Sequence, residues 1–276
     1  MPRKSSDLLK RRLKIAELVD RQGEIKVEDL SALLGVSGVT IRGDLSYLEQ
    51  QGYLKRSFGG AIATPTPSGA SSQEDADSPP PLTLANKIEI ARHCSRTIAE
   101  RETVFLGHGE TIRRIIPFLS GLSHLRLIVN DLQHALLAEQ FIDGEIIVAG
   151  DELIRHRSLL TGRALDDVIQ RFTVNHCILE VGLDDASGEC RIDQPLLARH
   201  YQRCLDKALN TTAVINNVVE SSGPVNSLGN LSQMKTLVAH RYINEHFQQL
   251  ISDAEFSIRY SNNECFTWSN RNFPGE

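Results

Sequence analysis

Between Thr64 and Pro81 the chain contains almost no large apolar side chain and is dense in Pro, Ser, Gly, Ala and acidic residues. A segment of this composition cannot bury enough apolar surface to offset the entropy that is lost on ordering. We therefore expect a flexible linker at residues 63–81, across which one hydrophobic core cannot extend. The sequence predicts two domains, residues 1–62 and residues 82–276, each within the usual range of about 50–250 residues.

The composition is that of an ordinary soluble protein, with 41% hydrophobic and 24% charged residues. No apolar run approaches the ~20 residues of a membrane-spanning helix, and Met1–Asp7 lack the apolar core of a secretory signal. We expect a cytoplasmic protein without a membrane partner.

Charge is distributed unevenly along the chain. Residues 1–60 carry eleven Lys and Arg against eight Asp and Glu, a net charge of +3. Because the whole chain has a net charge of −5, the remaining residues carry −8. A basic N-terminal part on an acidic remainder suits a protein whose contact with DNA is confined to one end.

The five cysteines are odd in number and none forms a Cys-x-x-Cys pair. This spacing predicts neither a disulfide framework nor a structural zinc site. His200 and Cys204 share a helical face at i, i+4 and could hold a metal, but no third ligand lies near them in the sequence. We expect no metal and no cofactor.

Residues 1–62 predict three helices followed by two short strands. Apolar residues recur at helical spacing in each helical segment, and Gly23, Gly35 and Gly52 end these segments. Ser37 is a good N-cap for the third helix, in which Ile41, Leu45 and Leu48 face inward at i, i+4 and i+7. Two helices joined by a tight turn that contains glycine form a helix-turn-helix motif, and the strands around residues 53–61 would form its wing.

The second helix of such a motif places its N-terminal half in the major groove of DNA. Arg42 can make the bidentate contact to guanine that is the commonest specific contact, while Lys55 and Arg56 suit phosphates. The candidate DNA-binding residues are Ser37, Gly38, Val39, Thr40, Arg42, Gly43, Ser46, Lys55 and Arg56. The alternative is a three-helix interaction module in which Arg42 is a solvated surface charge.

The stretches at residues 25–30, 34–45, 48–49, 52–56 and 59–61 together resemble the N-terminal signature of the DeoR family of bacterial sugar-metabolism regulators. The resemblance implies a winged helix-turn-helix, double-stranded operator DNA as the partner, and repression of a carbohydrate-utilisation operon. This chain departs from the family at Gly43, where a second basic residue is usual. A helical glycine costs about 1 kcal/mol relative to Ala, so binding is expected to be weaker or the operator unusual.

From Leu82 onward, short β-rich runs alternate with helical segments. Strands are expected at residues 103–106, 125–129, 145–149, 177–181 and 212–216, and helices at residues 84–100, 131–140, 163–171 and 195–209. This alternation predicts an α/β domain with a mostly parallel sheet that is covered on both faces.

This part also resembles the family's C-terminal domain, which is similar in fold to ribose-5-phosphate isomerase and commonly binds a phosphorylated sugar. Glycine-containing loops at strand ends let backbone N–H groups converge, and a following helix N-terminus favours an anion. The candidate effector-binding residues are Gly107, His108, Gly109, Glu110, Thr111, Arg113, Asn130, Gly150, Asp151 and Asp184. The alternative is that these loops are structural turns around a degenerate pocket.

Later segments depart further from the family. Pro195–Leu197 and then Arg199 and His200 stand where the family has a Glu and a Lys, and residues 216–223 lack the family's lysine. We therefore expect a small, hydroxyl-rich and anionic sugar-derived effector, rather than the usual sugar phosphate bound in the usual way.

Two further classes remain open. A sugar-phosphate isomerase needs a carboxylate base beside an anion site; Glu180, Asp184 and Asp185 are available, but the expected lysine and glutamate are missing, so we assign no catalytic residue. A purely structural interaction protein is the other class. For the DNA-binding regulator we expect a homo-oligomer, because one helix-turn-helix reads too few base pairs to be selective in a genome.

Overall fold

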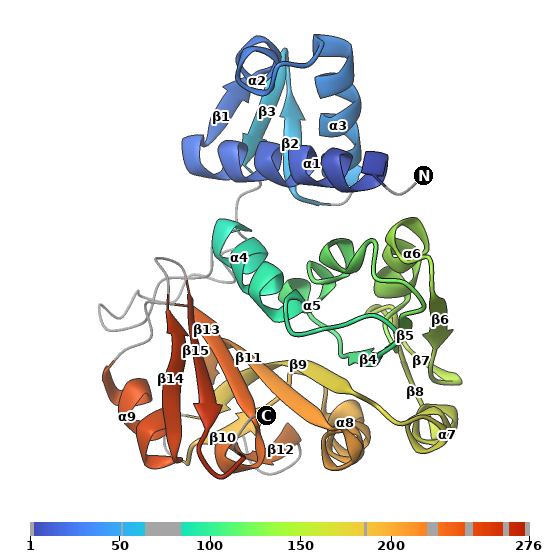
Figure 1. The fold of residues 1–276 in the computed structure, drawn as a ribbon, viewed down its shortest axis with the longest axis vertical. Helices are drawn as coiled ribbons and strands as arrows, with labels where there is room; N and C mark the ends of the chain where they lie inside the picture. The colour runs from blue at the N-terminus through green and yellow to red at the C-terminus, as the bar shows by residue number, and fades with distance from the viewer. Residues whose placement is uncertain are drawn as a thin grey trace. The chain divides into compact units, whose positions relative to one another are not determined.

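The computed structural model describes residues 3–50, 52–63, 84–184, 187–219, 226–240, 245–261 and 265–273. The chain divides into an N-terminal unit, Met1–Ile88, and a C-terminal unit, Glu89–Glu276 (Figure 1). Of the linker expected at residues 63–81, all but Ala63 lies outside the described residues. No helix in the described ranges has both the length and the apolarity that a membrane span requires.

The N-terminal unit is a winged helix-turn-helix, as the sequence predicts. Its three strands form an antiparallel sheet in the order β1-β3-β2. Its elements are α1 (Arg3–Gln22), β1 (Glu24–Lys26), α2 (Val27–Leu34), α3 (Gly38–Gln50), β2 (Leu54–Ser57) and β3 (Gly60–Ala63).

The turn between α2 and α3 is held by local hydrogen bonds. Gly35 adopts the left-handed conformation at φ 66°, and its N–H donates to the Ser31 carbonyl over 3.0 Å. The Ser37 hydroxyl accepts the N–H of Thr40 over 3.2 Å, which confirms the predicted cap. The inward face of α3 is buried as expected, including Ile41 and Leu45.

A buried ion pair joins α3 to α1. Asp44 is 2% exposed, and its two carboxylate oxygens accept hydrogen bonds from Nε of Arg11 (2.7 Å) and Nε of Arg12 (2.9 Å). The Arg12 guanidinium also lies 3.7 Å from the centre of the Tyr47 ring. Because these contacts tie one turn of α3 to α1, they set the direction in which the outer face of α3 points.

The glycine pair of the wing has a packing role. A Cβ on Gly60 would lie 2.3 Å from the backbone oxygen of Ile25, so β1 can pair with β3 at this register only if residue 60 has no side chain. The Gly59 carbonyl accepts the N–H of Val27 over 2.8 Å. The wing is thereby anchored to the start of α2.

The C-terminal unit is built on one large, mostly parallel sheet in the order β14-β15-β13-β11-β9-β4-β5-β6, with β10 and β12 attached beside β9 (Figure 1). Neighbours from β13 to β6 pair in parallel. The parallel strands are β4 (Thr103–Leu106), β5 (Arg126–Val129), β6 (Glu145–Val148), β9 (His176–Asp184), β11 (Asn210–Val219) and β13 (Thr236–His240). The remaining strands are β7 (Glu152–Ile154), β8 (Leu159–Thr161), β10 (Glu189–Arg191), β12 (Ser227–Asn230), β14 (Phe256–Ser261) and β15 (Cys265–Asn270).

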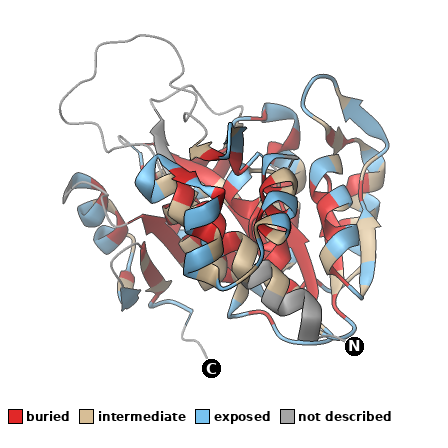
Figure 2. Cartoon of the chain, turned by 90° about the horizontal axis from the view of Figure 1, so that it is seen from above, coloured by how far each residue is buried: buried red, intermediate tan, exposed pale blue. Residues whose placement is uncertain are grey.

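Helices cover both faces of the central strands. Every residue of β4 is buried, and successive side chains of a strand point to opposite faces, so both faces must be covered (Figure 2). The helices are α4 (Leu84–Ser95), α5 (Glu110–Arg113), α6 (Leu132–Phe141), α7 (Arg163–Arg171), α8 (Pro195–Lys207) and α9 (Glu245–Asp253), with 3-10 turns η1 (Ile116–Leu119) and η3 (Leu231–Gln233).

The predicted α/β class is confirmed, and several expectations differ in detail, since the short strands β7, β8 and β10 were not predicted. The helix expected at residues 84–100 ends at Ser95, where the hydroxyls of Ser95 and Thr97 donate to the carbonyls of Arg92 and Cys94 and compete with helical hydrogen bonds. The sequence also predicts no strand beyond residue 216. The structure has four strands there: β12, which pairs with β10, the parallel strand β13 beside β11, and the antiparallel pair β14–β15, which extends the sheet at that edge.

Replacing Asp44 by Asn should lower the unfolding free energy of the N-terminal unit by about 2–4 kcal/mol, because two partly buried guanidinium groups lose their charged partner. Hydrogen–deuterium exchange of peptides from α1 and α3 in the full chain measures this loss. Asp29→Asn, at an exposed site on α2, is the control and should change stability by less than about 0.5 kcal/mol. Equal protection in both variants would contradict the role of Asp44.

Candidate functional site

In the N-terminal unit, the residues predicted to read DNA lie on the outer surface of α3 and on β2. Val39, Arg42 and Gly43 are exposed on α3, and Lys55 and Arg56 are exposed on the wing. A Cβ added at Gly43 would meet no atom within 4 Å, so a longer side chain has room there. Ser37 is exposed, while Gly38, Thr40 and Ser46 are partly exposed on the same helix.

Several of these residues also hold the wing against α3. Arg56 donates from Nη1 to the hydroxyl of Ser46 over 2.9 Å, and its backbone N–H donates to Glu49 over 2.8 Å. Ser46 in turn donates to the Arg42 carbonyl over 3.0 Å. The wing and α3 therefore form one connected surface, on which Arg42 and Lys55 are exposed.

Phe58 is a residue of this surface that the sequence reasoning missed. It sits in the two-residue turn between β2 and β3, and its side chain is fully exposed, at 107% of the reference area. The signal available in the sequence was an aromatic residue directly before Gly59, whose φ of 79° makes the turn tight.

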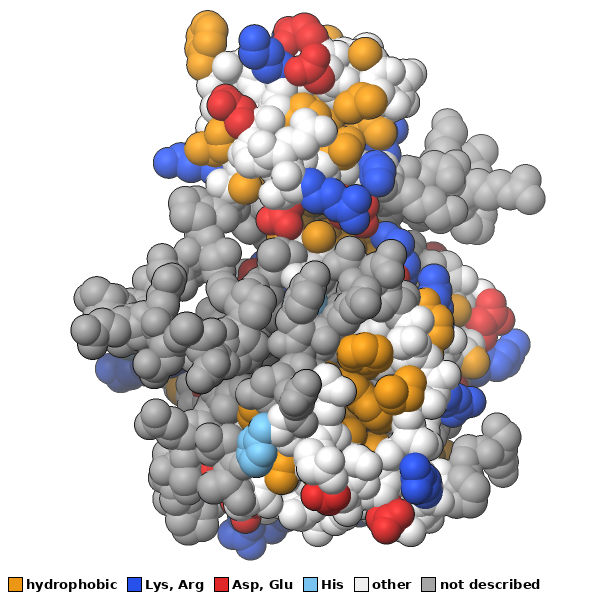
Figure 3. All heavy atoms as spheres, turned by 90° about the vertical axis from the view of Figure 1, so that its left-hand side faces the viewer, with side chains coloured by type: hydrophobic (Ala, Val, Ile, Leu, Met, Phe, Trp, Pro, Cys, Tyr) orange, Lys and Arg blue, Asp and Glu red, His pale blue; other side chains and the backbone are white. Residues whose placement is uncertain are grey.

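The charge of the N-terminal unit is not uniform over its surface. On the face drawn in Figure 3, basic, acidic and apolar side chains of this unit are interspersed.

In the C-terminal unit, a cavity of about 230 Å³ lies where the loop after β4 meets the end of β9. Three of the predicted effector residues line it: His108, Gly109 and Glu110. The other lining residues are Glu180, Val181, Gly182, Arg191, Ile192 and Asp193. Of the loops that the sequence predicts to bind an effector, only the loop after β4 lines this cavity, and β9 and β10 supply much of the rest of the lining.

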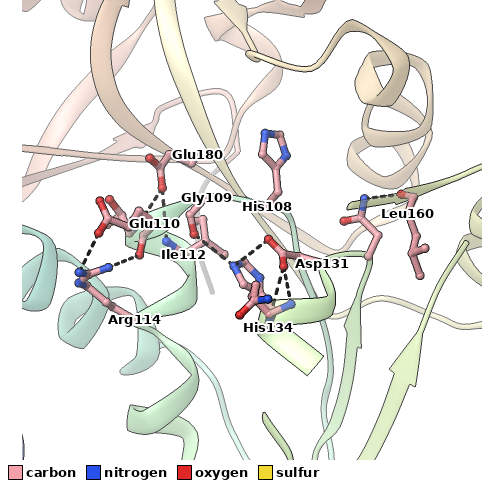
Figure 4. Close-up of polar contacts among 12 residues, drawn as sticks. His108, Gly109, Glu110, Ile112, Arg114, Asp131, His134, Leu160 and Glu180 are labelled. Carbon is pink, nitrogen blue, oxygen red and sulfur yellow. Dashed lines mark hydrogen bonds and ion pairs between the residues drawn. The ribbon is translucent and has the colours of Figure 1, made fainter. Parts of the chain in front are cut away.

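Glu180 holds the position at which the sequence predicts an effector anion (Figure 4). Its Oε2 accepts the backbone N–H of Thr111 over 2.8 Å and that of Ile112 over 3.4 Å, at the start of α5. Gly109, at φ 136°, passes so close that a Cβ would lie 2.4 Å from the same oxygen. The carboxylate of β9 is thus a built-in anion for this loop.

Glu110 and Arg114 form an ion pair beside the cavity. Arg114 is 2% exposed; its Nη2 donates to Glu110 Oε1 over 2.9 Å, and its Nη1 donates to the Glu110 carbonyl over 2.8 Å (Figure 4). The Glu110 side chain is about half exposed. The negative charge of Glu110 is therefore partly offset by the cation beside it.

A hydrogen-bond chain positions His108. Asn130 donates from Nδ2 to the Leu160 carbonyl (2.9 Å), so its Oδ1 is the acceptor for the Tyr201 hydroxyl (2.9 Å). The Tyr201 oxygen then accepts the backbone N–H of His108 (2.9 Å) and faces its Nδ1 (3.0 Å). Burial raises the pKa of Tyr201, which keeps this hydroxyl protonated.

The other ring nitrogen of His108, Nε2, donates to Asp193. This hydrogen bond lowers the pKa of the Asp193 carboxyl, and Arg157 acts in the same direction. Asp193 is therefore an ionised carboxylate at the rim of the cavity. Both Tyr201 and Asp193 were missed from the sequence, because they follow His108 by about ninety residues and no local spacing connects them.

Asp184 and Asn130 do not line the cavity. Asp184 is fully buried and accepts from Nε of Arg191 over 2.9 Å and from Ser187. Arg191 also donates to Glu189 over 2.9 Å, so this guanidinium is held by carboxylates of the chain itself. Asn130 is fully buried and acts through Tyr201.

Gly150 and Asp151 lie in a separate loop before β7. A Cβ on Gly150, at φ 124°, would lie 2.6 Å from Leu160 Cβ, so this glycine is needed for packing. Asp151 accepts the N–H of Ala164 over 3.2 Å at the start of α7, where its charge stabilises the helix N-terminus.

Three more predicted effector residues lie in the segment from the end of β4 to the end of α5 but do not line the cavity: Gly107, Thr111 and Arg113. A Cβ on Gly107 would lie 2.6 Å from Leu179 Cδ2. Thr111 is fully buried, and Arg113 is partly exposed on α5.

His134 on α6 supports this loop from below and was also missed. It is 1% exposed, and its Nε2 donates to the Gly109 carbonyl over 3.2 Å (Figure 4). Burial lowers the pKa of His134 to about 4, although Asp131 opposes this effect. The imidazole is therefore neutral at pH 7.

The structure separates the residues considered as metal ligands. His200 bonds to Asp166 over 2.6 Å, whereas Cys204 is buried in the core. All five cysteines are free and buried. Within the described residues, no group of three or more His, Cys, Asp or Glu has the arrangement of a metal site.

Two family models match the chain. The DeoR-like helix-turn-helix domain matches residues 11–66, and the DeoR C terminal sensor domain matches residues 83–240. Together they cover most of the chain, and each falls on one of the two sites described above.

Named relatives are transcriptional repressors. The glycerol-3-phosphate regulon repressor of Haemophilus influenzae is 32% identical over 178 residues, which cover 64% of this chain and 68% of that protein. The HTH-type transcriptional repressor CsqR of Escherichia coli is 24% identical over 242 residues, which cover 87% and 91%. Among solved structures, ribose 5 phosphate isomerase A from Neisseria gonorrhoeae is 12% identical with a TM-score of 0.36, covering 67% of this chain and 75% of that chain. A likeness that distant carries no argument about function.

Acidification should destabilise the C-terminal unit through His134. Its folded pKa of about 4 lies below the unfolded value of 6.5, so the unfolded state binds the proton more readily. Stability is fully present above pH 6.5 and falls by about 1.4 kcal/mol per pH unit toward pH 4 from this group alone.

Urea unfolding between pH 4 and 7 measures this slope. His134→Gln keeps a donor for the Gly109 carbonyl and should flatten the slope, whereas His246→Gln, at an exposed site on α9, should leave it unchanged. An unchanged slope in His134→Gln would show that another group causes the pH dependence.

Proposed function

The chain belongs to the DeoR family of transcriptional regulators, and from this premise we propose that it is a sequence-specific DNA-binding repressor of a carbohydrate-related operon. The observation that carries the proposal is the exposed face of α3 in a helix-turn-helix whose orientation the Asp44 ion pairs determine. We propose residues 1–62 as the DNA-binding domain and residues 82–276 as the sensing domain, joined by the linker at 63–81.

On DNA, Arg42 would read a guanine in the major groove, because it is exposed near the N-terminus of α3. Val39 would contact a thymine methyl group, and Lys55 with Arg56 would bind phosphates beside it. Phe58 extends from the tip of the wing and suits the apolar face of a deoxyribose. The contacts proposed for Ser37, Gly38, Thr40, Gly43 and Ser46 follow from their place on the same face.

The C-terminal unit would bind a small sugar-derived effector in the cavity at His108–Glu110. Relatives are named for the glycerol-3-phosphate regulon and the aga operon, which supports a link to carbohydrate metabolism. An effector changes repression only if it prefers the conformation that binds DNA poorly, because equal affinity for both conformations shifts nothing. Its binding must therefore be linked to a second conformation of the chain.

An isomerase activity is not part of the proposal. The relatives are transcriptional regulators. Asp184 is buried against Arg191 and does not line the cavity. Glu180 lines the cavity, but its Oε2 already accepts the backbone N–H groups of Thr111 and Ile112 at the start of α5. Asp185 lies outside the described residues.

We also propose a homo-oligomer that binds repeated half-sites. Two DNA-binding units on one face of the duplex multiply specificity, whereas one reads only a few base pairs. Ile258 on β14, an edge of the described sheet, is 61% exposed, and an apolar residue on an open strand edge suits contact with a second copy.

Arg42→Ala should weaken binding to the preferred operator by about 1–3 kcal/mol and remove discrimination at one base pair. The operator is first selected from a pool of random duplexes, and affinities are then measured by mobility shift on it and on single-base variants. Lys55→Ala is the contrasting variant: it should weaken all sequences equally and reduce the salt slope by about 1. The placement of α3 in the groove would be wrong if Arg42→Ala kept both affinity and base preference.

Gly43→Arg should tighten DNA binding. The position is exposed with no atom in the way of a new side chain, an arginine adds a phosphate contact, and the helix loses a glycine that costs about 1 kcal/mol. Gly43→Ala separates the two effects, because it restores helix propensity without adding charge. Weaker binding by both variants in the same mobility-shift assay would show that the operator backbone needs the space above Gly43.

A further inference from the structure

We propose that the cavity at His108–Glu110 selects an uncharged, hydroxyl-rich ligand, a free sugar or polyol, and that Glu180 excludes its phosphate esters. This inference rests on the proposed role of the C-terminal unit as a sensor. It replaces the anionic effector that the sequence alone predicts with a ligand class suited to the charges that line the cavity.

Backbone donors that would receive a phosphate are already engaged. A phosphate beside a turn of this kind is held by converging N–H groups. Here the N–H groups of Thr111 and Ile112 donate to Glu180 Oε2, at 2.8 and 3.4 Å. An incoming anion would have to displace a carboxylate that is part of β9.

Glu180 is held in this position by packing as well as by hydrogen bonds. The backbone at Gly109 lies against the carboxylate, since a Cβ at Gly109 would be 2.4 Å from Oε2 and 2.8 Å from the Glu180 Cβ. The neighbouring residues of β9 are buried on both sides of Glu180. The carboxylate of Glu180 on β9 is therefore fixed against the loop after β4, beside the cavity (Figure 4).

The charges around the cavity also disfavour an anion. Glu110, Glu180 and Asp193 present three carboxylates to the lining, of which Glu110 pairs with Arg114 and Asp193 with Arg157, so that carboxylates still outnumber guanidinium groups once Asp184 and Glu189 beside Arg191 are included. The guanidinium group of the lining residue Arg191 is engaged by Asp184 and Glu189, and that of the neighbouring Arg114 by Glu110. A phosphate dianion would meet net negative charge, and a partly enclosed site screens that repulsion less than water does.

The same groups suit sugar hydroxyls. Ionised carboxylates accept hydrogen bonds from hydroxyl groups, and such charge-assisted bonds are stronger than neutral ones. A volume of about 230 Å³ lies below the roughly 300–1,000 Å³ of pockets for drug-sized ligands, so a single sugar or short polyol fits best. The carboxylates of the lining then favour the free sugar over its phosphate ester, because they attract hydroxyl groups and repel the phosphate.

The test measures binding of matched pairs to the full chain by calorimetry: ribose, glucose and sorbitol against their monophosphates, with inorganic phosphate alone as a further probe. We expect at least one unphosphorylated member to bind at least about tenfold more tightly than its ester. Glu180→Gln removes the charge but keeps an oxygen for the Thr111 N–H, and should narrow this ratio about tenfold. Glu139→Gln, an exposed carboxylate on α6 away from the cavity, should leave the ratio unchanged.

Glu110→Gln provides a second variant at a half-exposed position of the same lining and should also raise the affinity for esters. Esters that bind more tightly than their parent sugars, an unchanged ratio in both variants, or no binding of any unphosphorylated member would each overturn the assignment. Operator binding without ligand is measured separately. If the full chain bound no operator, the proposed function as a DNA-binding regulator would be wrong, whereas the measured affinity ratios would still test the ligand class. The two failures can therefore be told apart.

Discussion

Glu180 is the one residue of β9 that is partly exposed, and its carboxylate accepts backbone hydrogen bonds from the start of α5. Because β9 pairs in parallel with both β4 and β11, its position in the sheet determines where the loop after β4 can pass. The same contact closes the loop and gives the cavity its negative charge. A change at this residue therefore alters packing and ligand chemistry together, which links the specificity of the cavity to the stability of the sheet.

Asp44 has a comparable role in the N-terminal unit. It engages Arg11 and Arg12, so two cations of the N-terminal unit hold α3 against α1. Arg42 and Lys55 remain on the outer surface. In each unit a buried or half-buried carboxylate makes structural contacts, and other charged groups remain on the surface or in the cavity. The net charge of the chain does not show which charged groups have which role.

The N-terminal fold was predictable because its signals are local: Gly35 and Ser37 mark the turn, and Ile41, Leu45 and Leu48 define the buried face. All the parallel strands except β13 were predicted from their apolar runs, and the cavity loop was predicted from the glycines after β4. The partners within the cavity were not. Asp184 looks like a ligand residue until Arg191 is seen beside it, and His108 is positioned by Tyr201, which follows it by about ninety residues. Nothing in a single sequence specifies such pairings.

The small number of outward-facing cations on α3 and the wing bears on how many copies of the chain are needed for tight binding to DNA. The cations that project from α3 and the wing include Arg42, Lys55 and Arg56, and Arg56 also braces Ser46. Each phosphate that a cation neutralises adds about 0.9 to the steepness with which log K falls with log salt concentration. A small number of outward cations therefore gives only modest non-specific attraction to DNA. One unit also reads too little sequence to stand out against the roughly 10⁶–10⁹ competing sites of a genome. Tight and selective binding then has to come from linking two or more units on repeated half-sites, where the second contact gains from the high effective concentration that the first creates.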